Sequence, residues 1–299
     1  MTTIHTLDLK FQDNSQAIAA YLIESNEGLI LIESGPESTF SHLEEALHNI
    51  GFSTSQVKHV LLTHIHFDHA GAAWKFAEIG AKVYVHPMGL PHLQNPEKLW
   101  NSAAQIYGDA MEQLWGKMQP ISKTRLVAVS DNDTIEIGNI NFKVIYTPGH
   151  AVHHNAYVFE NVIFTGDVAG VKIENGPVVP PCPPPDINIE AWKKSINKIK
   201  KHQPKALYLT HYGRQTAVQH HLAELEKILD DWSMWMKVHF DAGTPIEKTT
   251  ELFKNYISGQ YHEKRLVSSM IKTYEYANPA WMSVAGLLRY WKLKSQGRL

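Results

Sequence analysis

The sequence predicts an α/β fold that continues into a helical extension at its C-terminal end. Short runs rich in β-branched and aromatic residues alternate with helical runs up to about residue 213. Beyond that point apolar residues recur every three or four positions, as in residues 218–236, which is typical of amphipathic helices. We therefore expect residues 1–213 to form an α/β domain and residues 214–299 to form a helical extension.

The first part of the α/β domain is predicted to begin with a β-hairpin around Asn26-Glu27. A helix at residues 37–50 follows and ends at Gly51, and a second helix begins near Ala70. The helical and aromatic residues 88–119 are expected to form an insertion between strands. The predicted strands of this part lie at residues 17–24, 28–33, 57–63 and 82–86.

The second part of the domain is also rich in strands. A loop at residues 177–185 carries six prolines, which cannot enter the interior of a sheet, and a helix at residues 189–201 follows. The predicted strands of this part lie at residues 125–129, 134–137, 142–146, 156–160, 162–165 and 206–210.

Composition excludes several classes of function. The 299 residues, 43% of them hydrophobic, are enough to bury a large core. Lys and Arg number 28 against 30 for Asp and Glu, so no cationic field favours nucleic acid as a partner. The single cysteine, Cys182, excludes an intramolecular disulfide. Because we find no signal peptide and no apolar run of the roughly 20 residues that span a bilayer, we expect a cytoplasmic protein without a membrane partner.

A dense group of metal-ligand residues follows the predicted strand at residues 57–63. It reads His64-x-His66-x-Asp68-His69. Imidazole nitrogens and carboxylate oxygens hold Zn²⁺ or Fe without needing cysteine. In an extended segment residues two apart project to the same side, so His64 and His66 can bind one ion while Asp68 and His69 point to a second.

Three later motifs, each directly after a predicted strand, supply further ligands. They are Thr147-Pro148-Gly149-His150, Thr165-Gly166-Asp167 and Thr210-His211-Tyr212-Gly213. A glycine-containing turn beside a polar residue is commonplace, so each motif alone is a weak signal. In this order, behind the first group, they indicate a metal centre.

In order and spacing, the four motifs resemble the metallo-β-lactamase superfamily and most closely its glyoxalase II branch, over roughly residues 15–213. The resemblance implies a four-layer αββα sandwich as the catalytic domain. It also implies a dinuclear hydrolase in which a metal-bridging hydroxide attacks a small thioester, ester or lactone while Asp68 orients the hydroxide and passes on its proton. The implied ligands are His64, His66 and His150 for the first metal, Asp68, His69 and His211 for the second, and Asp167 for both.

Zinc is the expected metal, and iron and manganese remain alternatives because His and Asp suit all three. Many relatives carry Asp where this chain has Glu33. We expect Glu33 to orient a ligand histidine through a hydrogen bond. The true β-lactamases of the superfamily lack the bridging aspartate, so Asp167 makes β-lactam hydrolysis at most a side activity. Cys182 lies too far from the motifs to replace that ligand and is interpreted as a small buried or loop thiol.

Residues that contact the substrate are harder to identify. Tyr212 is a candidate donor to the substrate carbonyl oxygen, and His154 is a candidate for a supporting or substrate-facing role. His153 is expected to be exposed, and Arg214 is the cation nearest to His211 in sequence. The aromatic segment from Trp100 to Trp115 either covers the site or belongs to the core.

Two other interpretations of the chain stay open. A mononuclear iron persulfide dioxygenase would use only some of the same ligands, and an RNA-processing relative would bind RNA in a salt-dependent way. We favour a small-molecule substrate over nucleic acid, and the apolar helical tail makes a homodimer plausible.

Overall fold

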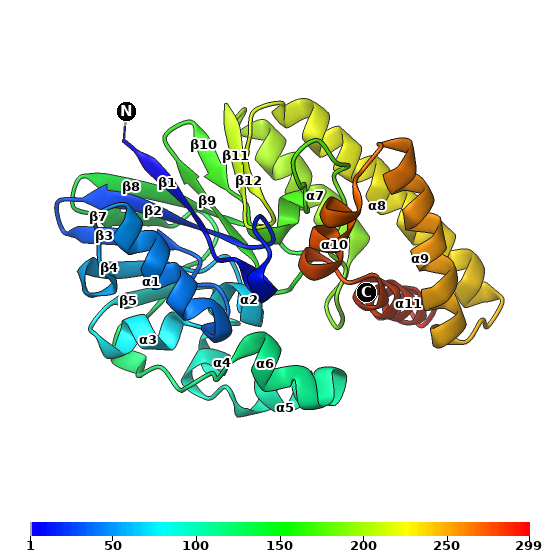
Figure 1. The fold of residues 1–299 in the computed structure, drawn as a ribbon, viewed down its shortest axis with the longest axis horizontal. Helices are drawn as coiled ribbons and strands as arrows, with labels where there is room; N and C mark the ends of the chain where they lie inside the picture. Colours follow the sequence, from blue (N-terminus) through cyan, green and yellow to red (C-terminus); the bar gives the residue numbers. More distant parts are fainter. Residues whose placement is uncertain (1) are drawn as a thin grey trace.

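The first of two sheets is built by the N-terminal part of the chain. The structure, a computed structural model, describes residues 2–299 (Figure 1). Strands follow one another across this sheet in sequence order, antiparallel from the first to the third and parallel from the third to the sixth. They are β1 (Ile4–Asp8), β2 (Ala19–Ser25), β3 (Gly28–Ile32), β4 (Val57–Leu61), β5 (Lys82–Val85) and β6 (Leu126–Ala128).

The second sheet comes from the middle of the chain, with the strand order β12-β11-β10-β9-β8-β7. All neighbours are antiparallel except β10 and β11, which are parallel and joined by a helix. The strands are β7 (Thr134–Ile137), β8 (Ile140–Tyr146), β9 (Asn155–Phe159), β10 (Val162–Phe164), β11 (Ala206–Leu209) and β12 (Gly213–Gln215).

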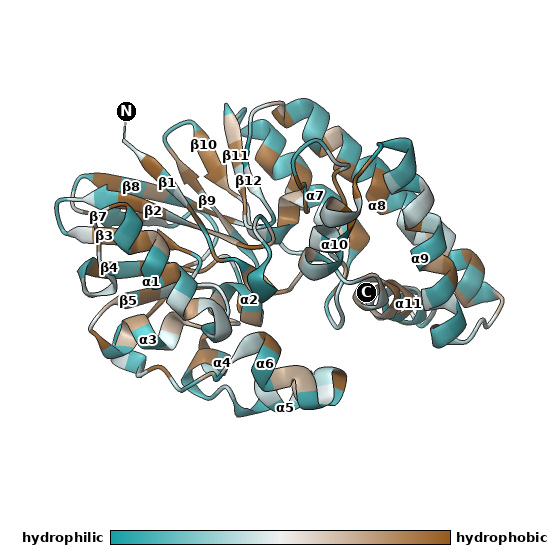
Figure 2. Ribbon diagram, in the orientation of Figure 1, coloured by the Kyte–Doolittle hydropathy of each residue, from teal (hydrophilic) through white to brown (hydrophobic). Residues whose placement is uncertain are grey.

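The two sheets face each other across an apolar core. Ile23 and Ile30 of the first sheet lie in one buried cluster with Phe142 and Tyr157 of the second. Successive strand residues point to opposite faces of a sheet, so Leu22, next to Ile23, belongs to the cluster on the outer face. Helices cover both outer faces, which gives the expected αββα sandwich. Figure 2 shows the hydrophobic residues concentrated along the strands.

Helices of the sandwich and of the insertion lie on the outer side of the first sheet. Leu43 and Leu47 of the first helix pack with Phe76 in the cluster beneath it. These helices are α1 (Phe40–Asn49), α2 (Phe67–Ala70), α3 (Ala73–Glu78), α4 (Leu90–Gln94), α5 (Glu97–Tyr107) and α6 (Met111–Trp115). Short 3-10 turns lie at Phe11–Asp13, Glu37–Thr39, Thr54–Gln56, Gly108–Ala110, Lys123–Arg125 and Gly166–Ala169.

The second sheet is covered by α7 (Ile189–Lys201), whose Trp192 and Ile196 pack in one cluster with Leu222 of the extension. The expected C-terminal helices follow the last strand, and the final helix packs against the two longest ones. They are α8 (Val218–Asp241), α9 (Ile246–Glu263), α10 (Ser268–Ala277) and α11 (Ala280–Ser295). No helix within residues 2–299 is both long and apolar enough to cross a membrane.

The structure confirms the predicted hairpin, whose strands β2 and β3 pair on either side of Asn26-Glu27. It corrects three details. The helix expected near Ala70 begins earlier, at Phe67, because His66 is extended and ends the preceding loop. Strands β1 and β12 were not predicted, since each is short, lies at a sheet edge and buries only one residue, Leu7 or Gly213.

Candidate metal centre

The predicted ligand residues meet at one edge of the sandwich. His64 and His66 lie in the loop after β4, and Asp68 and His69 lie on α2, which follows at once. The remaining three residues come from loops that follow β8, β10 and β11 of the other sheet, namely His150, Asp167 and His211. The turn at Gly166–Ala169 requires glycine at its first position, because Gly166 has a φ of +50° and an added Cβ would lie 2.4 Å from Thr63 Oγ1.

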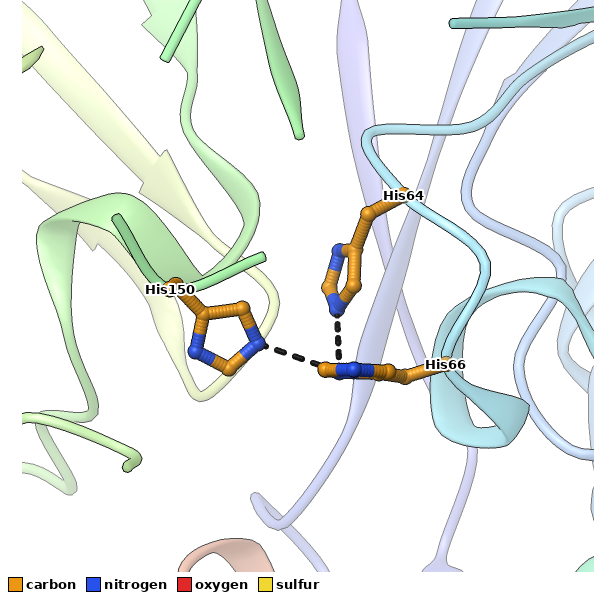
Figure 3. Close-up of side chains that lie close together, drawn as sticks. All are labelled: His64, His66 and His150. Carbon is orange, nitrogen blue, oxygen red and sulfur yellow. Dashed lines mark hydrogen bonds between the residues drawn. The ribbon is translucent and has the colours of Figure 1, made fainter. Parts of the chain in front are cut away.

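Three histidines form the first group of donors (Figure 3). His66 Nδ1 lies 2.8 Å from His64 Nε2 and 3.1 Å from His150 Nε2. Burial, reinforced by the charge of His150, lowers the pKa of His66 to about 3. The three imidazoles are thus neutral near pH 7, with ligand nitrogens directed at a common point.

A second group contains Asp68, His69 and His211. Asp68 Oδ2 lies 3.3 Å from His211 Nε2 and 3.7 Å from His69 Nε2. Asp167 joins the groups, because its Oδ1 lies 3.3 Å from His69 Nε2 while its Oδ2 lies 3.2 Å from His150 Nε2. One carboxylate therefore faces both sets of donors.

These side chains fit divalent cations. His69 Nε2, His211 Nε2 and Asp167 Oδ1 are buried, and none has a hydrogen-bond partner among residues 2–299. Leaving buried polar atoms unpaired costs free energy, so an unpaired cluster calls for an explanation such as a metal ion. The donors are imidazole nitrogens and carboxylate oxygens, the ligand types that Zn²⁺, Fe²⁺ and Mn²⁺ accept.

Hydrogen bonds on the far side of the ring orient His150 and His211. Nδ1 of His150 lies 2.8 Å from the Pro181 carbonyl oxygen, and Nδ1 of His211 lies 2.7 Å from that of Ala17. A carbonyl oxygen only accepts, so each Nδ1 donates its hydrogen, and in the neutral ring Nε2 then carries the lone pair that a cation can bind. The rings are therefore oriented by the backbone of two distant loops.

Glu33 orients two further histidines, His69 directly and His64 through Thr63. Its Oε1 accepts hydrogen bonds from His69 Nδ1 at 3.0 Å and from the Thr63 hydroxyl at 2.5 Å. Having donated its hydrogen, the Thr63 oxygen is an acceptor for His64 Nδ1, 3.0 Å away. Glu33 adopts a φ of +64°, a costly conformation for a residue with a Cβ. From this backbone conformation the Glu33 carboxylate contacts His69 directly.

Charges within the centre favour a cation at the second group. Burial acts to raise the pKa of Asp167, but His69, His150 and His211 outweigh it and hold that pKa well below its usual range. Burial likewise acts to raise the pKa of Asp68, and His69 and His211 instead lower it to about 2. Both carboxyl groups are therefore ionised across the physiological pH range and can bind a cation.

Two histidines next to each other in the chain, His153 and His154, make different contacts near the centre. His154 is buried, its Nε2 accepts the backbone N–H of Asp167 at 3.2 Å, and its Nδ1 bonds Thr147. It thus supports the Asp167 turn from behind. The expectation that His153 is exposed is wrong: it is only 8% exposed, and its ring stacks on that of His64 at a centroid distance of 6.1 Å. Its place beside the ligand rings buries it.

The other two substrate candidates lie apart from the cavity that the centre faces. Tyr212 packs between two core clusters, and Arg214 is exposed on β12; neither lines that cavity. Cys182 is fully buried, as a structural thiol would be, and burial raises its pKa. The sequence prediction placed Tyr212 by its proximity to His211 in the chain, whereas its partly buried side chain packs against the core clusters.

A cavity of about 560 Å³ opens directly onto the metal centre. His66, Asp68 and Asp167 lie at its floor. Its walls come from segments far apart in sequence, namely the insertion, the proline-rich loop and the junction of α10 and α11. The aromatic insertion therefore covers the site, although Trp100 itself does not line this cavity. Tyr107 of that segment lines it, and so does Met282, which no local sequence signal identified.

Comparison with known proteins agrees with this architecture. A profile described as the metallo-beta-lactamase superfamily matches residues 16–211. The metallo-beta-lactamase fold-containing protein ST1585 of Sulfurisphaera tokodaii is 30% identical over 162 residues, 53% of this chain and 61% of that relative. The match thus spans less than two thirds of the relative's length. A hydroxyacylglutathione hydrolase of Shewanella halifaxensis is 31% identical over 108 residues, 36% of this chain and 32% of that enzyme.

Solved structures show the same fold. The crystal structure of ST1585, an archaeal metallo-beta-lactamase superfamily protein from Sulfolobus tokodaii, has a TM-score of 0.62 at 25% identity and covers 75% of this chain and 86% of that one. The metallo-beta-lactamase family protein TTHA1429 of Thermus thermophilus has a TM-score of 0.68 at 19% identity. It covers 98% of this chain and 94% of that one. The fold shared with TTHA1429 therefore includes the C-terminal helices. With its profile match, its sandwich and its converging histidines and aspartates, this chain belongs to the metallo-beta-lactamase superfamily.

Proposed function

We propose that this protein is a dinuclear metal-dependent hydrolase that transfers the acyl group of a small thioester, ester or lactone to water. The observation that carries the proposal is Asp167, whose two carboxylate oxygens face two separate groups of donors. The similarity to a hydroxyacylglutathione hydrolase supports thioester or ester chemistry and a place near the glyoxalase II branch.

Seven residues would hold the two ions. Asp167 would contact both, and zinc is the expected metal, with iron or manganese as alternatives. When bound, such ions supply Lewis acidity that polarises a carbonyl and lowers the pKa of water. The other ligands would be His64, His66 and His150 for one ion and Asp68, His69 and His211 for the other.

Asp68 has the position of a catalytic carboxylate. It lines the cavity, and its side chain is 20% exposed, whereas that of Asp167 is 4% exposed. An ionised carboxylate at this boundary can orient a nucleophilic water, accept its proton on a carboxylate oxygen and release that proton to the leaving group. Glu33 and the carbonyl groups of Ala17 and Pro181 keep the histidines fixed during this proton transfer.

A substrate panel tests the proposal. The protein, loaded in turn with Zn²⁺, Fe²⁺ or Mn²⁺, is assayed with thioesters, esters and lactones beside the variant His66→Ala. Metal-dependent turnover that His66→Ala abolishes is the expected result. No turnover above the variant on any substrate contradicts hydrolysis. Oxygen consumption with one iron per chain would instead indicate a mononuclear persulfide dioxygenase.

A further inference from the structure

We propose that the acyl group of the substrate is an extended apolar chain that lies between the insertion and the C-terminal helices. This inference rests on the proposed hydrolase function and narrows its substrate class. It follows from the size of the cavity, the side chains of its walls and the contact between the two segments that flank it.

The cavity is large enough for a chain beyond the reacting carbonyl. Its volume of about 560 Å³ falls within the range of roughly 300–1,000 Å³ that small-molecule sites occupy. His66, Asp68 and Asp167 form only one end of it. In Figure 1, α2, which carries Asp68, lies at the edge of the sandwich, with the insertion helices below it and α10 and α11 to its right. Both segments contribute to the lining of the cavity.

Apolar side chains from four segments line most of the rest. Phe67 of α2, Leu99 of α5 and Met282 of α11 contribute to these walls, together with prolines of residues 181–185. Away from the metal centre, the charged lining residues within 2–299, histidines aside, are Lys98 and Asp186. A glutathione moiety carries two carboxylates, so a lining with a single lysine matches it poorly.

Unusually exposed apolar residues surround this cavity. Met88 is 43% exposed, Ile106 41% and Val152 42%, and all three line it. Clustered exposed apolar side chains mark binding grooves, because burying them under a ligand is favourable. An apolar acyl chain that extends from the metal centre would cover these three residues.

A contact joins the two segments that flank the cavity. The Tyr107 ring meets the Trp281 ring edge-on at a centroid distance of 5.7 Å, and Tyr107 Oη lies 3.9 Å from Met282 Sδ. Tyr107 ends α5, and Trp281 lies in the first turn of α11. The insertion and the extension thus contact each other beside the cavity, and both segments contribute to its walls.

A chain-length series tests this substrate class. We expect kcat/KM of the zinc-loaded protein for straight-chain acyl thioesters to rise about fourfold per added methylene from acetyl onward, until the cavity is filled. The variant Ile106→Ser removes apolar surface from the wall. It should reduce kcat/KM for the ten-carbon thioester at least threefold. Val238→Ser, which changes a 65% exposed residue of α8 outside the cavity, should leave it unchanged.

A binding measurement separates this inference from the hydrolase proposal. Calorimetry should show that the zinc-loaded protein binds decanoate much more tightly than acetate. The variant Ile106→Ser should weaken the binding of decanoate but not that of acetate. Turnover without dependence on chain length would overturn the inference and leave hydrolysis intact. Ile106-dependent decanoate binding without turnover of any ester would support the acyl cavity and contradict hydrolysis. The absence of both turnover and decanoate binding would overturn both the acyl-chain inference and the hydrolase proposal.

Discussion

Glu33 Oε1 accepts a hydrogen bond from His69 Nδ1 at 3.0 Å, which links the end of β3 to the metal-centre helix α2. The same carboxylate receives the Thr63 hydroxyl and, at 3.4 Å, that of Thr210. One buried carboxylate therefore connects loops of both sheets behind the proposed ligands. Glu33 makes these contacts from a backbone with φ of +64°, a conformation that costs free energy for a residue with a Cβ.

Replacing Glu33 by Gln should weaken metal binding. The amide oxygen still accepts a hydrogen bond, but the negative charge that orients His69 and raises its basicity is lost, so we expect a roughly 10- to 100-fold loss in metal affinity. Competition with a chromophoric chelator measures this affinity. Glu27→Gln, in the exposed turn between β2 and β3, is the matched control. Equal affinities for the two variants would contradict the orienting role.

Asp68→Asn should impair catalysis more than binding. An amide cannot accept a proton from water, so kcat at saturating metal should fall by about 10²–10⁴ while KM changes little. Steady-state kinetics with parallel metal analysis checks this, and Asp109→Asn, in the exposed 3-10 turn of the insertion, is the control. If kcat stays within a few-fold of the unmodified protein, Asp68 has no role in proton transfer.

Gly166→Ala should damage both stability and the metal centre. The added Cβ would lie 2.4 Å from Thr63 Oγ1 and 2.8 Å from His154 Nε2, the groups that support two proposed ligands. Gly243 also has a positive φ, +64°, but nothing lies within 4 Å of its Cβ, so Gly243→Ala should cost only about 1 kcal/mol of backbone strain. Denaturant unfolding and metal titration compare the two. A similar loss in both variants would show that the close approach at Gly166 is unimportant.

His221 should make the fold sensitive to acid. It is buried on α8 and contacts the Ala169 carbonyl oxygen at 2.8 Å, and burial lowers its pKa to about 4. An unfolded histidine titrates near pH 6.5, so between about pH 6.5 and pH 4 the unfolded chain binds more protons, and stability falls as the pH falls. His221→Gln should reduce the loss of unfolding free energy between about pH 7.5 and 4.5 by roughly 2 kcal/mol. Urea titrations in the presence of EDTA measure the unfolding free energy at each pH. The same loss in His221→Gln and in the unmodified protein would contradict the prediction.

Local sequence signals account for the parts that could be predicted. The turn Asn26-Glu27 lies between two apolar runs, so the β2–β3 hairpin was readable from a short window. The residues His64, His66, Asp68 and His69 share one loop and helix, and His150, Asp167 and His211 each follow a strand end. Strand ends of packed sheets meet at an edge, which is why the structure brings these donors together.

Long-range packing accounts for what the sequence could not predict. Tyr107 meets Trp281 only because the insertion and the extension fold over the same edge, and no local pattern relates two such distant residues. The burial of His153 likewise depends on the ring of His64, which belongs to the other sheet's loop. Tyr212 was assigned to the site from its neighbour in the chain, and the packing of its side chain against the core clusters is a tertiary property.

Metal content tests the central claim of two ions joined by Asp167 most directly. Elemental analysis of the protein after saturation with Zn²⁺ and removal of excess ion should give two ions per chain. His211→Ala, which removes one donor of the second group, should reduce this to one. A stoichiometry of one or less in the unmodified protein, or no difference in His211→Ala, would contradict a dinuclear centre.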